Sequence, residues 1–144
     1  PLRPGEPPYA LRPAPGTLPP GEVTPIEPAR FANGATLSGY ALGDGEVALI
    51  WQLAGPGGAD AQAFVHALDA SGARLAQADR PAWPGRYWRA GDRLVLWFDL
   101  ALPPETASVY AGMYTVEGEA FRNVEVLDEA GAYLAQGATI PLGG

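Results

Sequence analysis

The sequence predicts an all-β protein, an antiparallel β-sandwich of seven or eight strands with an immunoglobulin-like or jelly-roll-like arrangement. Short segments alternate between apolar and polar residues with a period of two, which is typical of strands with one buried face. Turn residues separate these segments every eight to fifteen positions, and no helical pattern of useful length competes with them. Together these observations favour two packed sheets.

The first expected strands run over Ala35–Leu42 and Glu46–Ala54 and are joined by a Gly-Asp-Gly turn at residues 43–45. The second segment, EVALIWQLA, is apolar on both faces. A strand of this kind suits a position between two layers, so we expect Trp51 to lie in the core.

A hairpin is expected from Ala61–Asp69 and Arg74–Ala78, with the turn at Ser71-Gly72. Leu94–Leu102 has the clearest period-two pattern, with Phe98 on the apolar face and Trp97 on the other. We expect Phe98 to lie between the sheets and Trp97 to lie in the core as well.

Three further strands are expected in the last third of the chain. Ser108–Val116 follows a Pro-Pro turn and places Tyr110, Gly112 and Tyr114 on one face. Phe121–Leu127 and Tyr133–Leu142 follow and are joined by the turn sequence Asp-Glu-Ala-Gly.

Residues 1–28 are expected to form an extended arm, and residues 29–144 the sandwich domain. Ten of the 16 prolines lie in this first segment. Proline lacks a backbone N–H and fixes φ, which favours polyproline-like structure over strand pairing.

The charge of the chain limits its partners. Sixteen acidic side chains oppose nine basic ones, all of them arginine, which gives a net charge of −7. Nucleic acids and anionic membranes attract basic surfaces, so neither is an expected partner. A glycan or a protein remains a possible partner, and no 18-residue apolar run indicates a membrane span.

The sequence predicts no catalytic or metal site and no cofactor. There is no cysteine and a single histidine, His66, which excludes thiolate and multi-histidine sites. The expected role of His66 is structural, as a mid-strand residue that bonds backbone or carboxylate groups.

Four aspartates are the acid–base candidates. Asp69, Asp79 and Asp92 are expected at turns or strand ends, where aspartate caps backbone N–H groups. Asp99 is the exception, since it interrupts a hydrophobic strand, and it is expected to pair with an arginine such as Arg93 or Arg122 or to mark a bulge. We therefore expect a protein that is not an enzyme.

The best binding candidate in the sequence is the connection from Arg80 to Asp92. It groups three aromatic and three basic residues, namely Arg80, Trp83, Arg86, Tyr87, Trp88 and Arg89. Two alternatives follow. Exposed rings would stack on a sugar or dock a protein, whereas buried rings would plug one end of the sandwich.

Several pieces of the sequence, taken in order, resemble one known kind of domain. These are FANGATLSGYAL at 31–42, LIWQL at 49–53, FVHALD at 64–69 with Gly72, AQAD at 76–79 with Pro81, then Gly85, Trp88, Gly91-Asp92, LPP at 102–104 and GMY at 112–114. The set is similar to an extracytoplasmic β-sandwich domain that is attached to bacterial multi-pass membrane glycosyltransferases of the protein-mannosyltransferase-like class. This chain departs from the pattern in a shorter loop between Gly85 and Gly91 and a longer end after Tyr114.

The resemblance implies a non-catalytic accessory or recognition domain on the outer side of a bacterial membrane, because the transferase chemistry of that class belongs to membrane segments. A free carbohydrate-binding module and a protein–protein interaction domain are the alternatives.

Overall fold

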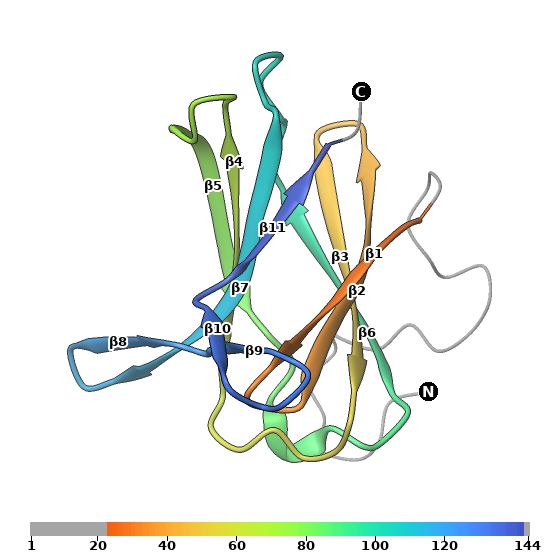
Figure 1. Ribbon diagram of the computed structural model, residues 1–144, viewed down its shortest axis with the longest axis vertical. Helices are drawn as coiled ribbons and strands as arrows, with labels where there is room; N and C mark the ends of the chain where they lie inside the picture. The colour runs from red at the N-terminus through yellow and green to blue at the C-terminus, as the bar shows by residue number, and fades with distance from the viewer. Residues whose placement is uncertain (1–22, 143–144) are drawn as a thin grey trace.

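The computed structural model describes residues 23–142, which form a two-layered β-sandwich (Figure 1). This confirms the predicted all-β class. Eleven strands are present in this part of the chain, together with one 3₁₀ turn, η1 (Gly85–Tyr87). Every strand pair is antiparallel.

Sheet A, as we name the larger layer, has the strand order β10-β9-β1-β2-β3-β6. Its strands are β1 (Thr24–Phe31), β2 (Ala35–Gly43), β3 (Glu46–Leu53), β6 (Arg93–Asp99), β9 (Val126–Leu127) and β10 (Tyr133–Ala135). Sheet B has the order β11-β7-β4-β5, and β8 pairs with the far end of β7. Its strands are β4 (Gln62–Leu68), β5 (Arg74–Pro81), β7 (Ser108–Glu117), β8 (Ala120–Asn123) and β11 (Ala138–Pro141).

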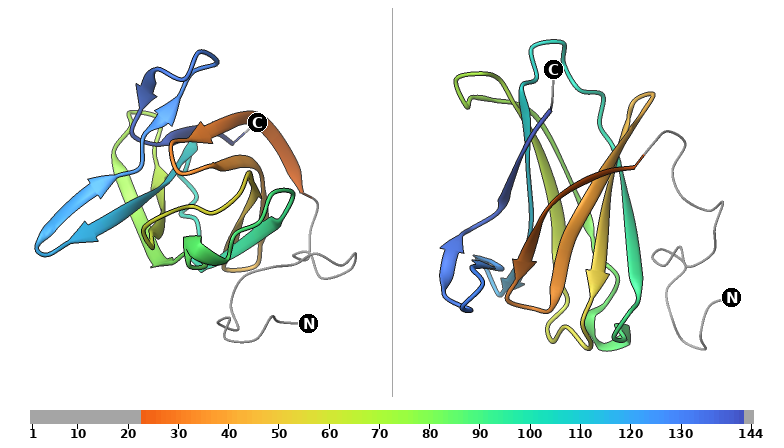
Figure 2. Two further views of the ribbon diagram at one scale, coloured as in Figure 1. Left: turned by 90° about the horizontal axis from the view of Figure 1, so that it is seen from below. Right: turned by 45° about the vertical axis from the view of Figure 1, so that its right-hand side comes forward.

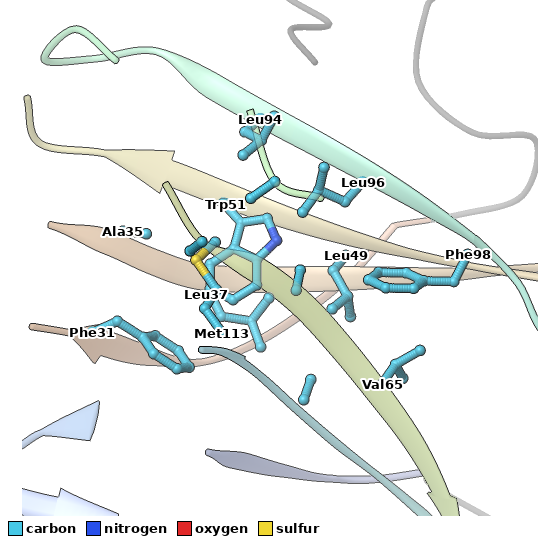
Figure 3. Close-up of a cluster of buried hydrophobic side chains, with 14 of the residues drawn as sticks. Phe31, Ala35, Leu37, Leu49, Trp51, Val65, Leu94, Leu96, Phe98 and Met113 are labelled. Atoms are coloured by element: carbon cyan, nitrogen blue, oxygen red, sulfur yellow. The ribbon is translucent and has the colours of Figure 1, made fainter. Parts of the chain in front are cut away.

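The core lies between the two sheets, where the inward residues of alternate positions meet (Figure 3). Trp51 and Phe98 are both fully buried there, as predicted, and the Trp51 ring meets Phe31 edge-on at 5.2 Å between centroids. Inward side chains with no polar atoms fill most of the remaining space, so their burial supplies the main driving force for folding.

The prediction that Trp97 lies in the core with Trp51 is wrong, because position 97 faces away from sheet B. Trp97 is partly buried on the outer face of sheet A, against a smaller cluster formed by Ala41, Ala48, Ile50 and Val95, with Val23 beside it. Strand β3 therefore has apolar contacts on both faces, in accord with the prediction made from its sequence.

Two of the expected strands each divide between the two sheets, which adds to the number of strands. The segment expected over Phe121–Leu127 divides into β8 in sheet B and β9 in sheet A, and the last segment divides in the same way into β10 and β11. At the second break the Tyr110 ring lies directly against Gly137, where an added Cβ would be only 2.5 Å from the ring. A glycine is therefore needed where the chain passes from one sheet to the other.

Strand β1 includes residues 24–28, which the sequence placed in the proline-rich arm. Its prolines are accommodated because the register shifts between Pro25 and Ala29 and because β9 pairs with β1 only at Arg30 and Phe31. Proline is tolerated at such irregular or unpaired positions. Residues 1–22, the rest of the expected arm, lie outside the described residues.

Two features of the overall arrangement are relevant to function. The β7–β8 hairpin projects away from the body of the sandwich (Figures 1 and 2). The connection from β5 to β6, which contains η1, lies at one end of the two layers, beside the connection from β3 to β4.

Candidate binding site

The tryptophans of the Arg80–Asp92 connection are buried, with 0% of Trp83 and 2% of Trp88 exposed. Trp88 Nε1 donates a hydrogen bond of 2.8 Å to the carbonyl oxygen of Trp83. Both rings belong to the main core cluster. They close one end of the sandwich, which is the arrangement expected under the second of the two alternatives.

Two glycines allow this close packing. The Trp88 ring lies over Gly57, where an added Cβ would be 2.5 Å from ring carbons, and a Cβ on Gly85 would be 3.0 Å from the backbone of residues 57 and 58. The amide of Gly57 also donates to the carbonyl of Gly85 at 2.8 Å. The β3–β4 and β5–β6 connections therefore hold each other in place.

The arginines and the tyrosine of the Arg80–Asp92 connection lie in two different places. Arg80 reaches from β5 to sheet A, where its Nη1 donates to the carbonyl oxygen of Trp97 at 2.9 Å. Arg86 lies over the Tyr87 ring at 4.7 Å from its centroid and is exposed to solvent, as is Arg89. Only the Arg86–Tyr87–Arg89 surface is thus open to a ligand without rearrangement of the core, and its use in binding stays a prediction.

A second concentration of aromatic side chains lies on the outer face of sheet B. Seven residues line a shallow groove of about 310 Å³, which we call the aromatic groove: Phe64, His66, Asp79, Tyr110, Tyr114, Phe121 and Asn123. They come from four neighbouring strands, β4, β5, β7 and β8. Since the groove is a surface feature of a rigid sheet, its walls are positioned by the ladder hydrogen bonds.

Strand register explains how these side chains meet. His66 pairs with Tyr110, and Phe64 pairs with Gly112 on one side and Asp79 on the other, so all of them point to one face. The Phe64 ring lies over Gly112, where an added Cβ would be 2.8 Å from it. Phe64 is only 5% exposed and forms the floor of the groove.

The projecting hairpin supplies the outer wall. Tyr114 pairs with Asn123 and Val116 pairs with Phe121, which places these four side chains on the face of the hairpin that continues the groove. Phe121 is 72% exposed, and its ring meets that of Tyr114 edge-on at 5.5 Å. Val116, which pairs with Phe121, is 49% exposed, so the two side chains form an exposed apolar patch of the kind that marks contact sites.

Polar groups are fixed at the rim of the groove. Tyr114 Oη donates to Asp79 Oδ2 at 2.8 Å, and Gln77 Nε2 donates to Asp79 Oδ1 at 3.2 Å. Asn123 Nδ2 donates to Gln136 Oε1 at 2.6 Å. A ligand would therefore meet aromatic faces together with an oriented carboxylate and an oriented amide.

The ionisable groups of the groove respond to burial and to one another. Burial lowers the pKa of His66, the nearby Arg74 lowers it further, and Asp79 partly opposes both. Burial also raises the pKa of Tyr110, with a contribution from Tyr133. The pKa of Tyr114 is raised by burial and then by its hydrogen bond to Asp79. Near pH 7 the histidine is accordingly neutral and both tyrosines keep their protons.

The four aspartates that are acid–base candidates in the sequence are separated in the fold. Asp69 Oδ1 accepts bonds from Ser71 and from the amide of Ala73, and these bonds lower the pKa of its carboxyl group. Asp92 accepts a bond from the amide of Arg89, and Asp99 ends β6 opposite Glu46. Within residues 23–142 no group of three metal-ligating side chains comes together. The aromatic groove itself offers ring faces for stacking and fixed polar groups for hydrogen bonding.

A larger hollow of about 790 Å³ opens on the other side of the sandwich, between β1 and β11. Its lining is mainly small or aliphatic, with residues such as Ile26, Ala138 and Ile140 and the single charged residue Glu27. Among the described strands, β11 forms an edge of sheet B. This hollow offers backbone and apolar contacts but few oriented polar side chains.

The sequence contained part of the information needed to find the aromatic groove. Alternation placed Phe64 with His66, and Tyr110 with Tyr114, on single faces of two expected strands. Nothing in the local pattern indicated that these strands are neighbours, since the residues involved are more than forty positions apart.

No known protein family, curated protein or solved structure matches this chain. Within the described residues, no helix has the length and apolar character needed to cross a membrane.

Proposed function

We propose that this domain recognises glycans through the aromatic groove. The observation that carries the proposal is the grouping of the Tyr110, Tyr114 and Phe121 rings with the oriented polar ends of Asp79 and Asn123. The C–H face of a pyranose ring is apolar and packs on aromatic rings, while its hydroxyl groups need carboxylate and amide partners. The groove offers both on one rigid surface.

The size and openness of the groove favour a short stretch of glycan chain. A hollow of about 310 Å³ is at the lower end of the range for small-molecule sites. Its walls come from a flat sheet and a projecting hairpin, so a chain could enter and leave along the surface. This arrangement suits recognition of an exposed polysaccharide segment.

The wider setting of this function follows from the sequence resemblance. We infer a non-catalytic accessory domain, located outside the cytoplasm of a bacterium and tethered to a membrane glycosyltransferase-like protein. In that setting the groove would hold part of the acceptor or product glycan near the membrane. The alternative of a free carbohydrate-binding module uses the same groove.

A glycan array followed by calorimetric titration of the best binder tests the proposal. Phe121→Ala removes the most exposed ring and should weaken binding about tenfold or more. Leu42→Ala is the matched control, since Leu42 is an exposed apolar residue in β2 of the other sheet. An array without binders, or equal affinities for the wild type and Phe121→Ala, would refute the proposal.

A second candidate function is protein docking at the hollow between β1 and β11. The two sheets are bridged by Arg80 near β5 and β6, whereas an open hollow separates β1 from β11. An extended segment of another protein could add to the edge strand β11 and place its side chains in this hollow. Ala138→Trp would fill the hollow and should abolish such docking while leaving glycan binding unchanged.

A further inference from the structure

We propose that the aromatic groove selects sugars that carry a protonated amino group, with Asp79 as the counter-charge. This inference rests on the proposed glycan recognition and specifies the class of sugar. It follows from the charge of the groove, the character of its walls and the position of the carboxylate.

The charge of the groove is negative. Among the seven described residues that line it, Asp79 is the one carboxylate, while burial and the nearby Arg74 lower the pKa of His66 and so disfavour its cationic form. Arg74, at the start of β5, does not line the groove, although its charge is near enough to act on His66. The whole chain has a net charge of −7, which adds a weak attraction for cations at longer range.

The walls of the groove favour a cation for a second reason. Aromatic faces carry negative electrostatic potential and attract an ammonium group within about 6 Å of a ring centroid. The rings of Tyr114 and Phe121 meet edge-on at 5.5 Å, so they form a corner rather than a flat stack. A cation placed in this corner would be close to more than one ring.

The carboxylate is placed to complete such a site. Asp79 is solvent-exposed and lies diagonally opposite Tyr114, across β4. Its bonds from Tyr114 and Gln77 use two of the roughly four acceptor positions of a carboxylate. The capacity that remains suits a charge-assisted bond from an ammonium donor.

Neutral N-acetylated sugars present the same ring without the charge. A groove built for them would gain only hydroxyl hydrogen bonds from an exposed carboxylate, whose hydration is partly lost on binding. A deacetylated sugar instead pairs its ammonium group with Asp79 and offsets this cost. The acetyl group is therefore the feature against which the groove discriminates.

A matched pair of oligosaccharides provides the test. Calorimetric titration at pH 6 compares a β-1,4-linked glucosamine tetramer with its fully N-acetylated counterpart, since the two share the same ring and linkage. The wild type should bind the glucosamine tetramer about tenfold more tightly, the gain expected from one favourable cation–aromatic and carboxylate site. Raising the salt concentration should reduce this ratio, because exposed ionic contacts are screened.

Two variants assign the preference to Asp79. Asp79→Asn should reduce the affinity ratio to near one while leaving binding of the acetylated tetramer within a few fold. Asp60→Asn removes the same charge from an exposed position near Arg86 and should leave the ratio unchanged.

The outcomes separate this inference from the proposed function. Equal binding of both tetramers, a preference for the acetylated one, or array binders that are all neutral sugars would overturn the inference and leave glycan recognition standing. A ratio that persists in Asp79→Asn would also overturn it. A glycan array without binders, together with no binding of either tetramer, would refute both the inference and the proposed function.

Discussion

Tyr114 of β7 donates its hydroxyl hydrogen to the carboxylate of Asp79 in β5 at 2.8 Å, across the intervening strand β4. The bond joins two strands that are not neighbours in the sheet. It spans the outer face beside Phe64, which pairs with Asp79 in the ladder. The aromatic groove is therefore held by a side-chain bond as well as by the backbone.

This bond makes the stability of the protein sensitive to alkaline pH. Burial and the hydrogen bond to Asp79 raise the pKa of Tyr114 in the folded state. A raised pKa gives a stabilisation that is complete below the unfolded-state pKa, about 10, and is lost as the pH rises through the folded-state value. Tyr114→Phe keeps the ring and removes the titrating group.

Denaturant unfolding at pH 8 and pH 11 measures this effect. The wild type should lose more unfolding free energy between the two pH values than Tyr114→Phe does. Absorbance titration at the phenolate band should lose one late-titrating tyrosine in the same variant, while Tyr110, whose pKa is also raised, still titrates late. Identical pH dependence in both proteins would contradict this assignment.

The single histidine gives a direct measurement of the environment of the groove. Burial and Arg74 lower the pKa of His66, so its proton NMR titration should have a midpoint below the ordinary value of 6.5. A lowered pKa of a base means that the unfolded chain binds the proton more readily. The resulting stabilisation is present above the unfolded-state pKa and is lost as the pH falls through the folded-state pKa.

His66→Gln should remove this acid-side loss of stability, as measured by unfolding at pH 7.5 and pH 5.5. Arg74→Gln should shift the histidine midpoint upward, towards 6.5, because it removes one of the two causes. A midpoint above 6.5 in the wild type would show that Asp79 dominates instead.

The contact between Trp88 and Gly57 predicts a strongly position-specific effect of one methyl group. A Cβ on residue 57 would be 2.5 Å from the Trp88 ring, so Gly57→Ala must displace a buried tryptophan or the loop that carries it. We expect a loss of about 1–3 kcal/mol in unfolding free energy, as is usual for overpacking. Gly43→Ala, where the nearest atom is 3.6 Å away, is the control and should have little effect.

Substitution of two large inward side chains tests the assignment of the core between the two sheets. Trp51 of β3 and Phe98 of β6 are buried at alternate positions that face sheet B. Replacement of either by alanine should cost roughly 3–5 kcal/mol, as observed for large aromatic residues in cores. Leu134→Ala, at an exposed position, should change stability by less than about 0.5 kcal/mol. Equally small effects at Trp51 and Phe98 would contradict the assignment of both to the core.

The expected strands are found because alternation is a local property of the chain. Leu94, Leu96 and Phe98 face inward as their spacing predicts, and β3 is covered on both faces as its composition predicts. Strand β1 is not predicted by the sequence because its prolines disfavour pairing, and only the bulge in β1 itself, opposite β2, makes room for them. The resulting register depends on contacts with other strands, so it cannot be inferred from the sequence of the segment alone.

The candidate site was predicted less well than the fold. The connection around Trp83 and Trp88 had the richest local composition, yet its rings are used to close the core. The aromatic groove draws on residues from Phe64 to Asn123 whose meeting depends on which strands pair. Composition identifies residues suited to binding, whereas strand pairing decides which of them reach the surface together.

The two sides of the sandwich differ in how they are closed. Arg80 links β5 to the backbone of β6, whereas the hollow between β1 and β11 leaves the opposite side open. Local opening should therefore begin at β11 and the first half of β1, whose amides should exchange with deuterium well before those of β3 and β4. The floor of the aromatic groove, Phe64, belongs to β4 in the slowly exchanging half, so an opening that begins at β11 would reach this floor last.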